Sequence, residues 1–293
     1  MSRFCILRTA ITEGCLRAKA GFAAKPFNED EVMDMDDQVW FQSLTWEEVK
    51  QKTRESKNTI ILPVGSTEQH GTHLPVGTDT MVATALAESA ARKAKVLVAP
   101  PLWFGWSPHH MVLPGTITIR PEILIEVVYD VVKSLNGHGF DKFIFLNGHR
   151  LVNISWLQMA GERAKREIGI KVAIFDPAFM SKEFTQSFGW GEVGHADEIE
   201  SSHMWYCYPE LVKMERAKDN PHKHRKLYRV DPKYTGDTLC YVPSSRAEQE
   251  ALVRISGGTS GEPSKASQEG GKEYHEHLVE RLVAVIKMVQ EQE

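Results

Sequence analysis

The sequence contains few cysteines, and none of them form a closely spaced pair. The chain has 293 residues and four cysteines, which are Cys5, Cys15, Cys207 and Cys240. Disulfide frameworks and thiolate zinc sites need cysteines at short, regular spacings, so the sequence predicts neither. This cysteine usage is typical of a reducing compartment, and we expect a cytoplasmic protein.

Long hydrophobic runs are also absent. The longest apolar segments, such as 59–64 and 143–146, are much shorter than the roughly 20 residues that a helix needs to cross a bilayer. Residues 1–25 are basic but lack the continuous apolar stretch of a secretory signal. A transmembrane protein is therefore excluded, and we expect no membrane partner.

No charge of one sign dominates the sequence. Lys and Arg number 35 against 39 Asp and Glu, which gives a formal net charge of -4. Without a basic excess, a nucleic-acid partner is not expected. Hydrophobic residues make up 42% and charged residues 25%, as in ordinary globular proteins.

The length suits one large α/β domain. Residues 1–38, which include an acidic run, are interpreted as an N-terminal extension, and residues 39–293 as a single domain. Segment 220–272 is rich in polar, Gly and Pro residues and is predicted to be an irregular insertion. Its basic part, 221–226, is either a solvated patch or a contact for an acidic ligand or a neighbouring subunit.

Short apolar runs alternate with helical patterns from residue 44 onward. The predicted strands are 59–64, 95–100, 141–146 and 170–175. The predicted helices begin near residue 45 or span 78–93, 121–135, 153–167 and 273–290, and segment 177–200 is predicted to be a loop. This alternation predicts an α/β fold with a mostly parallel sheet and helices on both faces.

Metal-ligand residue types follow the predicted strands. Glu68 and His70 come after the first strand, Asp79 follows a short loop, and His149 comes after the third strand. The carboxyl ends of parallel strands face one crevice, so we expect these side chains to converge. Two carboxylates and two imidazoles suit Zn²⁺, Mn²⁺ or Fe²⁺, and Asp79 is placed to bridge two such ions.

A second acidic cluster follows the predicted loop. His195, Asp197, Glu198 and Glu200 lie within segment 195–200, where a helix is predicted to begin near Ala196. Carboxylates are stabilised in the first turn of a helix by its dipole, so simple capping is one interpretation. Taken with the first cluster, a shared functional site is the other.

Four ordered sequence blocks resemble the creatininase (creatinine amidohydrolase) family. They are GSTEQHGTHLPVGTD at 65–79, PGTIT at 114–118, LNGH at 146–149 and HADEIESS at 195–202. The resemblance runs from about residue 44 to residue 209. It implies a three-layer α/β/α fold, a binuclear metal centre, frequent assembly as a homohexamer, and hydrolysis of cyclic amides or formamides.

The resemblance also implies a ligand set. Glu68, Asp79 and His149 match the ligands of one metal ion, and His70 with a bridging Asp79 matches part of the second site. We therefore expect two divalent transition-metal ions, either Zn, Mn or Fe, and a homo-oligomer.

The last ligand of the second site is less clear from the resemblance. Creatininase proper has a glutamate two residues after the third-strand histidine, where this chain has Leu151. Relatives without it have a glutamate in the later block that matches Glu198, which we predict as the ligand, with Glu200 as the alternative. His195 and Glu200 match the proton-handling pair of the family.

Four further residues are predicted to contact substrate. Trp190 lies in the loop before His195, and its alternative is core packing. Trp106 and His110 precede the second block, where His110 either lines the pocket or holds the loop by hydrogen bonds. Arg150 replaces a glycine of many relatives and is predicted to bind a substrate oxygen or to form a surface ion pair.

The expected function is hydrolysis of a small polar, cyclic amide or formamide at its C–N bond. The mechanism is attack of a metal-bound hydroxide on the carbonyl, with His195 and Glu200 shuttling a proton. One alternative is a C–C bond hydrolase that opens a keto-inositol ring, as some relatives of this family do. An alternative of another class is a non-catalytic, metal-stabilised oligomer that binds a ligand.

Overall fold

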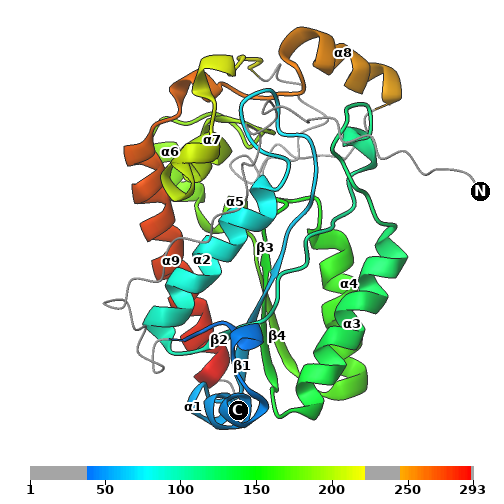
Figure 1. The fold of residues 1–293 in the computed structure, drawn as a ribbon, viewed down its shortest axis with the longest axis vertical. Coiled ribbons are helices and arrows are strands. Elements are labelled where there is room, and N and C mark those ends of the chain that lie inside the picture. Colours follow the sequence, from blue (N-terminus) through cyan, green and yellow to red (C-terminus); the bar gives the residue numbers. More distant parts are fainter. Residues whose placement is uncertain (1–37, 222–244, 292–293) are drawn as a thin grey trace, which may run out of the picture. The chain divides into compact units, whose positions relative to one another are not determined.

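A four-stranded parallel sheet organises the fold (Figure 1). The computed structural model describes residues 38–221 and 245–291, which belong to one compact unit, Asp37–Glu293. Residues 1–37 of the predicted extension and most of the basic segment 221–226 lie outside the described residues. The strand order is β2-β1-β3-β4, with bounds β1 Thr59–Val64, β2 Leu97–Val98, β3 Lys142–Asn147 and β4 Lys171–Phe175.

Helices cover both faces of the sheet, and the middle residues of the two central strands, 60–64 and 143–146, are apolar and buried. All six residues of β1 are buried, and Ile61 pairs with Ile144 of β3 in register. One face packs against α2 (Thr78–Ala94) and α9 (Gln268–Glu291), and the other against α3 (Pro121–Gly137) and α4 (Ile154–Ile168). The predicted three-layer α/β/α fold is thus confirmed.

The remaining helices are shorter. The α-helices are α1 (Trp46–Glu55), α5 (Pro177–Met180), α6 (Lys182–Ser187), α7 (Glu198–Cys207) and α8 (Arg246–Ser256). The 3₁₀ helices are η2 (Phe41–Ser43), η3 (Pro108–His110), η4 (Pro209–Leu211), η5 (Met214–Arg216) and η7 (Pro263–Lys265). Within the described ranges, no helix is both long and apolar enough to cross a membrane.

Four segments differ from the sequence-based predictions. Segment 177–200, predicted to be a loop, contains the short helices α5 and α6 and the start of α7. The second strand shrinks to the two residues of β2. The segment predicted to be an irregular insertion contains α8, which begins with a capping box between Ser245 and Glu248. Helix α9 begins at Gln268 rather than at Glu273.

Two glycines allow backbones to approach closely. A Cβ at Gly271 of α9 would lie 1.9 Å from the Ser202 carbonyl oxygen on α7. A Cβ at Gly148, just after β3, would lie 2.1 Å from the Asp79 carbonyl oxygen at the start of α2. Only glycine permits these contacts, which seat α7 and α2 at the carboxyl ends of the strands.

Candidate metal centre

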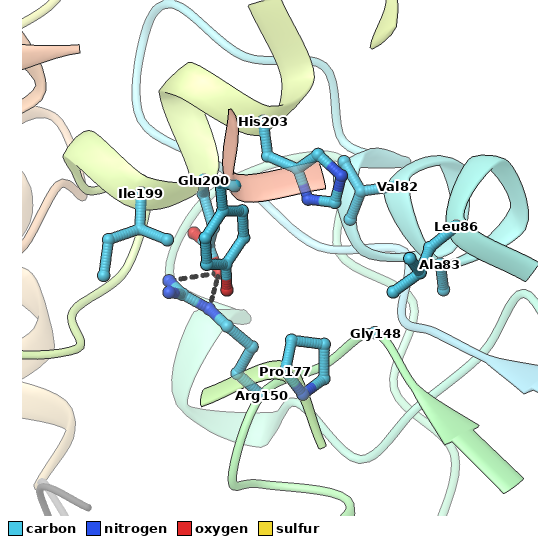
Figure 2. A pocket seen from close by; sticks show the side chains of 10 residues that line it. Val82, Ala83, Leu86, Gly148, Arg150, Pro177, Ile199, Glu200 and His203 are labelled. Atoms are coloured by element: carbon cyan, nitrogen blue, oxygen red, sulfur yellow. Dashed lines mark hydrogen bonds and ion pairs between the residues drawn. The ribbon is translucent and has the colours of Figure 1, made fainter. Parts of the chain in front are cut away.

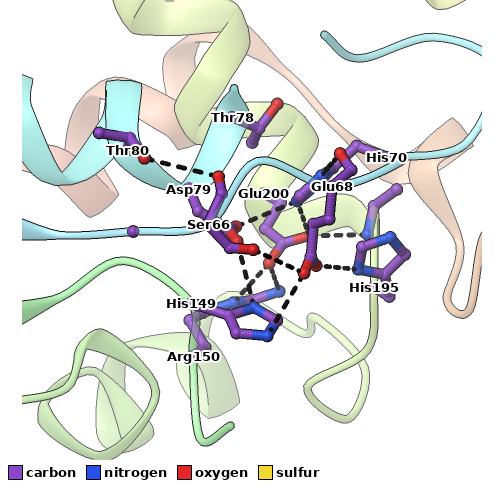
Figure 3. Close-up of polar contacts among 12 residues, drawn as sticks. Ser66, Glu68, His70, Thr78, Asp79, Thr80, His149, Arg150, His195 and Glu200 are labelled. Carbon is purple, nitrogen blue, oxygen red and sulfur yellow. Dashed lines mark hydrogen bonds and ion pairs between the residues drawn. The ribbon is translucent and has the colours of Figure 1, made fainter. Parts of the chain in front are cut away.

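Four of the five predicted ligands, together with Glu200, converge at the carboxyl ends of β1 and β3 (Figure 3). The loop after β1 carries Glu68 and His70, and the first turn of α2 carries Asp79. His149 follows β3, and Glu200 lies in the first turn of α7. All five side chains are buried.

One group of ligand atoms comes from Glu68, Asp79 and His149. His149 Nε2 lies 3.3 Å from Glu68 Oε2, and His149 Nδ1 lies 3.1 Å from Asp79 Oδ2. The Ser66 hydroxyl donates to Glu68 Oε2 at 3.0 Å and fixes this carboxylate. The three side chains can therefore ligate one ion.

A second group comes from His70, His195 and Glu200. His70 Nδ1–H donates to the Glu68 carbonyl oxygen at 3.1 Å, so its Nε2 faces the cluster. That Nε2 atom lies 3.1 Å from Asp79 Oδ1 and 3.6 Å from Glu200 Oε2. Asp79 thus stands between the two groups and turns one carboxylate oxygen toward each.

His195 and His110 line the same cluster. His195 Nε2–H donates to the Gln69 carbonyl oxygen at 2.5 Å, which leaves Nδ1 3.5 Å from Glu68 Oε1. The side-chain amide of Gln69 donates to His110 Nδ1 at 2.8 Å, and His110 Nε2 lies 3.4 Å from Glu68 Oε1. The two imidazole rings stack with centroids 3.9 Å apart.

Burial and charge shift the pKa values of these side chains in opposite directions. Burial raises the pKa of Glu68 to about 7. Burial lowers the pKa of His70, but the charge and hydrogen bond of Asp79, together with the charges of Glu200 and Glu68, outweigh burial and raise the pKa to about 10. Burial also lowers the pKa of His149, but Glu68 and Asp79 together outweigh burial and raise this pKa to about 9. Burial and the neighbouring His110 keep the pKa of His195 well below 6.5.

The cluster is chemically suited to metal ions. Glu68 Oε1 and Asp79 Oδ2 are buried without a hydrogen-bond partner among the described residues. Unpaired buried carboxylate oxygens are costly, and divalent cations are natural partners for them. Carboxylates and imidazoles in this proportion suit Zn²⁺, Mn²⁺ or Fe²⁺.

Arg150 is buried beside the cluster and held by two carboxylates. Its Nε donates to Glu200 Oε1 at 2.9 Å, and its Nη2 donates to Asp197 Oδ2 at 3.0 Å. Asp197 also caps α7, because its Oδ1 accepts from the Glu200 amide at 2.8 Å. The ion pair predicted at the surface is therefore buried. Arg150 also lines the pocket, but its charge is already paired with these two carboxylates.

A small cavity lies behind this ion pair, between Arg150, Glu200, His203 and Tyr274 (Figure 2). Its volume is about 20 Å³, which is room for one water molecule. Arg150 Nη1 has no hydrogen-bond partner among the described residues, so a buried water there would satisfy it.

Glu198 does not join the metal-ligand groups, which corrects its sequence-based assignment. Its Oε1 accepts from the Gly191 amide at 2.5 Å, and its Oε2 accepts from the Glu262 amide at 2.9 Å. The buried carboxylate thus ties two loops to the start of α7. Of the two candidate glutamates, only Glu200 reaches the cluster.

The two tryptophans predicted to contact substrate lie elsewhere. Trp190 is buried in the apolar core, where its ring packs against Phe188 and Tyr274, so the alternative interpretation of core packing applies. Trp106 is half-buried and packs against the core on the α3 side of the sheet. Neither residue lines the pocket over the cluster.

An open pocket of about 530 Å³ leads to the cluster. His110, His149, His195 and Glu200 line its floor, together with His109. The opposite wall comes from α8, including Leu252, and from segment 258–261 by way of Ser260. Helix α8 was not among the sequence-based predictions, although the capping box at Ser245 and the glycine after Ser256 are signals of a helix.

A three-layer α/β/α fold, with carboxylates and imidazoles clustered at the strand ends of its parallel sheet, is typical of metal-binding α/β proteins. Residues 42–286 match the family described as Creatininase: Creatinine amidohydrolase. The chain therefore belongs to the creatininase family, a family of hydrolases.

Known relatives in this family act on different substrates. The chain is 30% identical to the 3-dehydro-scyllo-inosose hydrolase of Thermotoga maritima over 63% of this chain and 61% of that protein. It is 30% identical to the creatinine amidohydrolase of Pseudomonas putida over 75% of this chain and 94% of that protein. A mycofactocin precursor peptide peptidase of Mycobacterium ulcerans is 31% identical over 54% of this chain and 62% of that protein.

Solved creatininase structures share the fold. A creatininase variant superposes with a TM-score of 0.74 at 25% identity, covering 87% of this chain and all of that chain (100%). A structure described as the Mn form gives 0.71 at 26% identity, covering 87% and 100%. A variant described as Zn-Zn type also gives 0.71 at 26% identity, covering 87% and 99%.

Proposed function

We propose that the protein is a binuclear metal-dependent hydrolase of a small polar, cyclic amide or formamide. The observation that carries this proposal is the position of Asp79, whose two oxygens lie 3.1 Å from imidazole nitrogens of two different ligand groups. A carboxylate in that position would serve as a ligand to both ions of a binuclear site. The Mn and Zn-Zn descriptions of similar creatininase structures support a transition metal at this place.

The ligands divide between two sites. Glu68, Asp79 and His149 would hold the first ion. His70 and Glu200, with the second oxygen of Asp79, would hold the second ion. Two divalent ions, when bound there, would polarise a substrate carbonyl and lower the pKa of a water molecule.

His195 is the group that moves the proton. The hydrogen bond from Nε2–H to Gln69 fixes the tautomer in which Nδ1 carries a lone pair and faces the cluster. Its pKa lies well below 6.5, because burial and His110 disfavour the charged form, so His195 is neutral near pH 7. A neutral imidazole can accept a proton from the attacking water and donate it to the leaving nitrogen.

The surroundings of the cluster favour a small polar substrate. The pocket of about 530 Å³ has a floor of imidazoles and carboxylates, and a compact polar ring fits such a volume. Arg150 orients Glu200 through a hydrogen bond of 2.9 Å, and His110 is positioned to contact a substrate oxygen. We further propose a cytoplasmic homo-oligomer, which the family resemblance supports.

A second candidate is hydrolysis of a C–C bond in a cyclic diketone such as a keto-inositol. The similarity to a 3-dehydro-scyllo-inosose hydrolase supports this reaction. Leu151, at the position where creatininase proper has a glutamate, also separates this chain from that enzyme. The same ligands and His195 would serve, with carbon as the leaving atom.

Metal content and a substrate panel test both candidates. We expect about two equivalents of transition metal per chain by mass spectrometry, and turnover that Glu68→Gln abolishes. Lactams, formamides and cyclic keto-polyols offered to the metal-loaded protein distinguish C–N from C–C cleavage.

Loss of metal in Asp79→Ala with unchanged folding would support the enzyme. Metal content of one equivalent or less, together with no turnover on reconstitution, would contradict it and favour the non-catalytic ligand-binding oligomer.

A further inference from the structure

A second cluster of metal-ligand residues lies outside the centre described above. His203 and Cys207 are one helical turn apart on α7, and His275 lies on the adjacent α9 (Figure 1). His203 and His275 are 4% and 6% exposed, and Cys207 is half-buried. One ligand atom from each residue lies within 4.8 Å of the others.

The distances among these atoms are close to those of a tetrahedral zinc site. His203 Nε2 lies 3.0 Å from His275 Nδ1, and Cys207 Sγ lies 3.8 Å from the same nitrogen. Zinc bonds of ordinary length, at tetrahedral angles, separate two nitrogens by about 3.3 Å and a nitrogen from a sulfur by about 3.5 Å. Small side-chain rotations therefore bring all three atoms into ligand position.

The surroundings prepare the imidazoles for ligation. His275 Nε2 lies 2.9 Å from the Ser89 hydroxyl oxygen, which can accept a hydrogen bond from Nε2–H and leave the Nδ1 lone pair for the metal. Burial lowers the pKa of His275 to about 4, with Glu276 opposing and Lys93 adding to the shift, so the ring is neutral at pH 7. A neutral imidazole is the form that binds metals.

We propose that His203 Nε2, Cys207 Sγ and His275 Nδ1 bind a third metal ion, of the zinc class. The Cys207 thiol loses its proton to solvent as the sulfur–metal bond forms, and water completes the fourth position on the half-buried side of Cys207. A thiolate ligand selects Zn²⁺ over Mn²⁺, which prefers oxygen ligands. The site is independent of the proposed function, because it shares no ligand with the binuclear centre.

The ion would link α7, which carries Glu200 of the binuclear centre, to the neighbouring α9. Helix α7 carries Glu200 in its first turn, and its far end is joined to α9 by this cluster. A metal bridge between α7 and α9 stabilises the folded state by the free energy of binding. The third ion is thus a structural support for α7, with no part in the chemistry.

Metal counting with two different metals tests the proposal. Apo-protein is reconstituted with Zn²⁺ or with Mn²⁺, desalted and measured by mass spectrometry. We expect about three equivalents of Zn²⁺ but about two of Mn²⁺ in the wild type, and about two of either in Cys207→Ser. Equal Zn²⁺ content in the wild type and Cys207→Ser would overturn the third site, whereas loss of the other two equivalents would count only against the proposed function.

Cobalt absorption gives a readout specific to the thiolate. Co²⁺-loaded wild type should show a thiolate-to-cobalt charge-transfer band that Cys207→Ser and His275→Gln both lack. The other cysteines, Cys5, Cys15 and Cys240, lie outside the described residues, so a variant with all three changed to Ser serves as the matched control and should keep the band. A band that persists in Cys207→Ser, or that disappears in this control, would overturn the assignment.

Discussion

Three acidic side chains at the start of α7 have three different roles. Asp197 caps the helix and pairs with Arg150, Glu198 ties two loops, and Glu200 reaches the metal-ligand cluster. Residues two apart on a helix point about 160° away from each other, so Glu198 and Glu200 cannot face the same site. The sequence alone does not say which of the two faces the metal-ligand cluster, because both are glutamates of the same short motif.

Matched glutamine variants separate these two glutamates. In Glu200→Gln we expect metal affinity to fall by at least about 10- to 100-fold, the loss that even an outer-shell partner causes, and turnover to fall with it. In Glu198→Gln we expect normal metal content but a free energy of unfolding lower by about 1–3 kcal/mol, because a buried amide N–H has lost its acceptor. Metal analysis and urea unfolding check both, and metal loss confined to Glu198→Gln would reverse our assignment.

Arg150 offers a second test at the residue scale. Arg150→Met leaves Asp197 and Glu200 as buried carboxylates without their cation. We expect the free energy of unfolding of the metal-free protein to fall by about 3–5 kcal/mol, the usual cost of breaking a buried ion pair. Urea denaturation measures it. The double variant Arg150→Met/Asp197→Asn should recover part of the loss, and no recovery would mean that Arg150 acts through packing alone.

At the scale of elements, strands were easier to predict than the helices around the site. Continuous apolar runs identify the middle of β1 and of β3, because strands buried on both faces have few polar positions. Helix α9 was predicted to start too late, because Gly270 and Gly271 usually disfavour helices. Here Gly271 is required by the close approach of Ser202, a tertiary contact that the local sequence does not reveal.

Helix α8 forms a pocket wall whose stability should affect substrate binding. Ser245→Ala removes the capping box, and we expect a local loss of about 0.5–2 kcal/mol in helix stability. Amides of α8 should exchange faster, and KM should rise while kcat and metal content stay unchanged, because α8 carries none of the ligands.

The matched control is the other capping box, at Thr45 of α1. This helix lies at the opposite end of the sheet from α8 (Figure 1). Thr45→Ala should lose similar local stability without any change in KM. Equal KM values for Ser245→Ala and the wild type would show that α8 does not contribute to binding.

At the scale of the whole molecule, buried histidines should make stability depend on pH. Burial lowers the pKa of His73 and of His275 to about 4 from an ordinary value of 6.5. The unfolded chain therefore binds protons at these residues first. Their stabilisation is complete above pH 6.5 and is lost as the pH falls from 6.5 toward 4.

Urea unfolding of metal-free protein between pH 7.5 and 4.5 checks this expectation. The pKa of Glu68 is raised to about 7, so its contribution to stability changes in the opposite direction and grows as the pH falls from 7 to 4.5. The informative quantity is therefore the difference in unfolding free energy between the wild type and His73→Gln or His275→Gln. Each variant should lose less stability on acidification than the wild type. Parallel pH curves for wild type and variants would contradict the argument.

The candidate site combines residues that are distant in sequence, and only part of it was predictable. Glu68, Asp79 and His149 converge as expected, because loops after adjacent parallel strands open into one crevice. The burial of Trp190 and Arg150 could not be predicted, since an aromatic or a charged residue in a loop can face solvent or core. The burial of Trp190 and Arg150 depends on how α7 and α9 pack against the sheet.

Gly148 has a consequence for how this sequence can vary over evolutionary time. A side chain at position 148 would collide with the backbone of Asp79, the residue between the two ligand groups. In a saturation library selected for activity, position 148 should therefore accept glycine alone, while exposed positions away from the pocket, such as Met159 of α4, accept many residues. An invariant residue without any functional atom would then mark the metal centre as clearly as its ligands do.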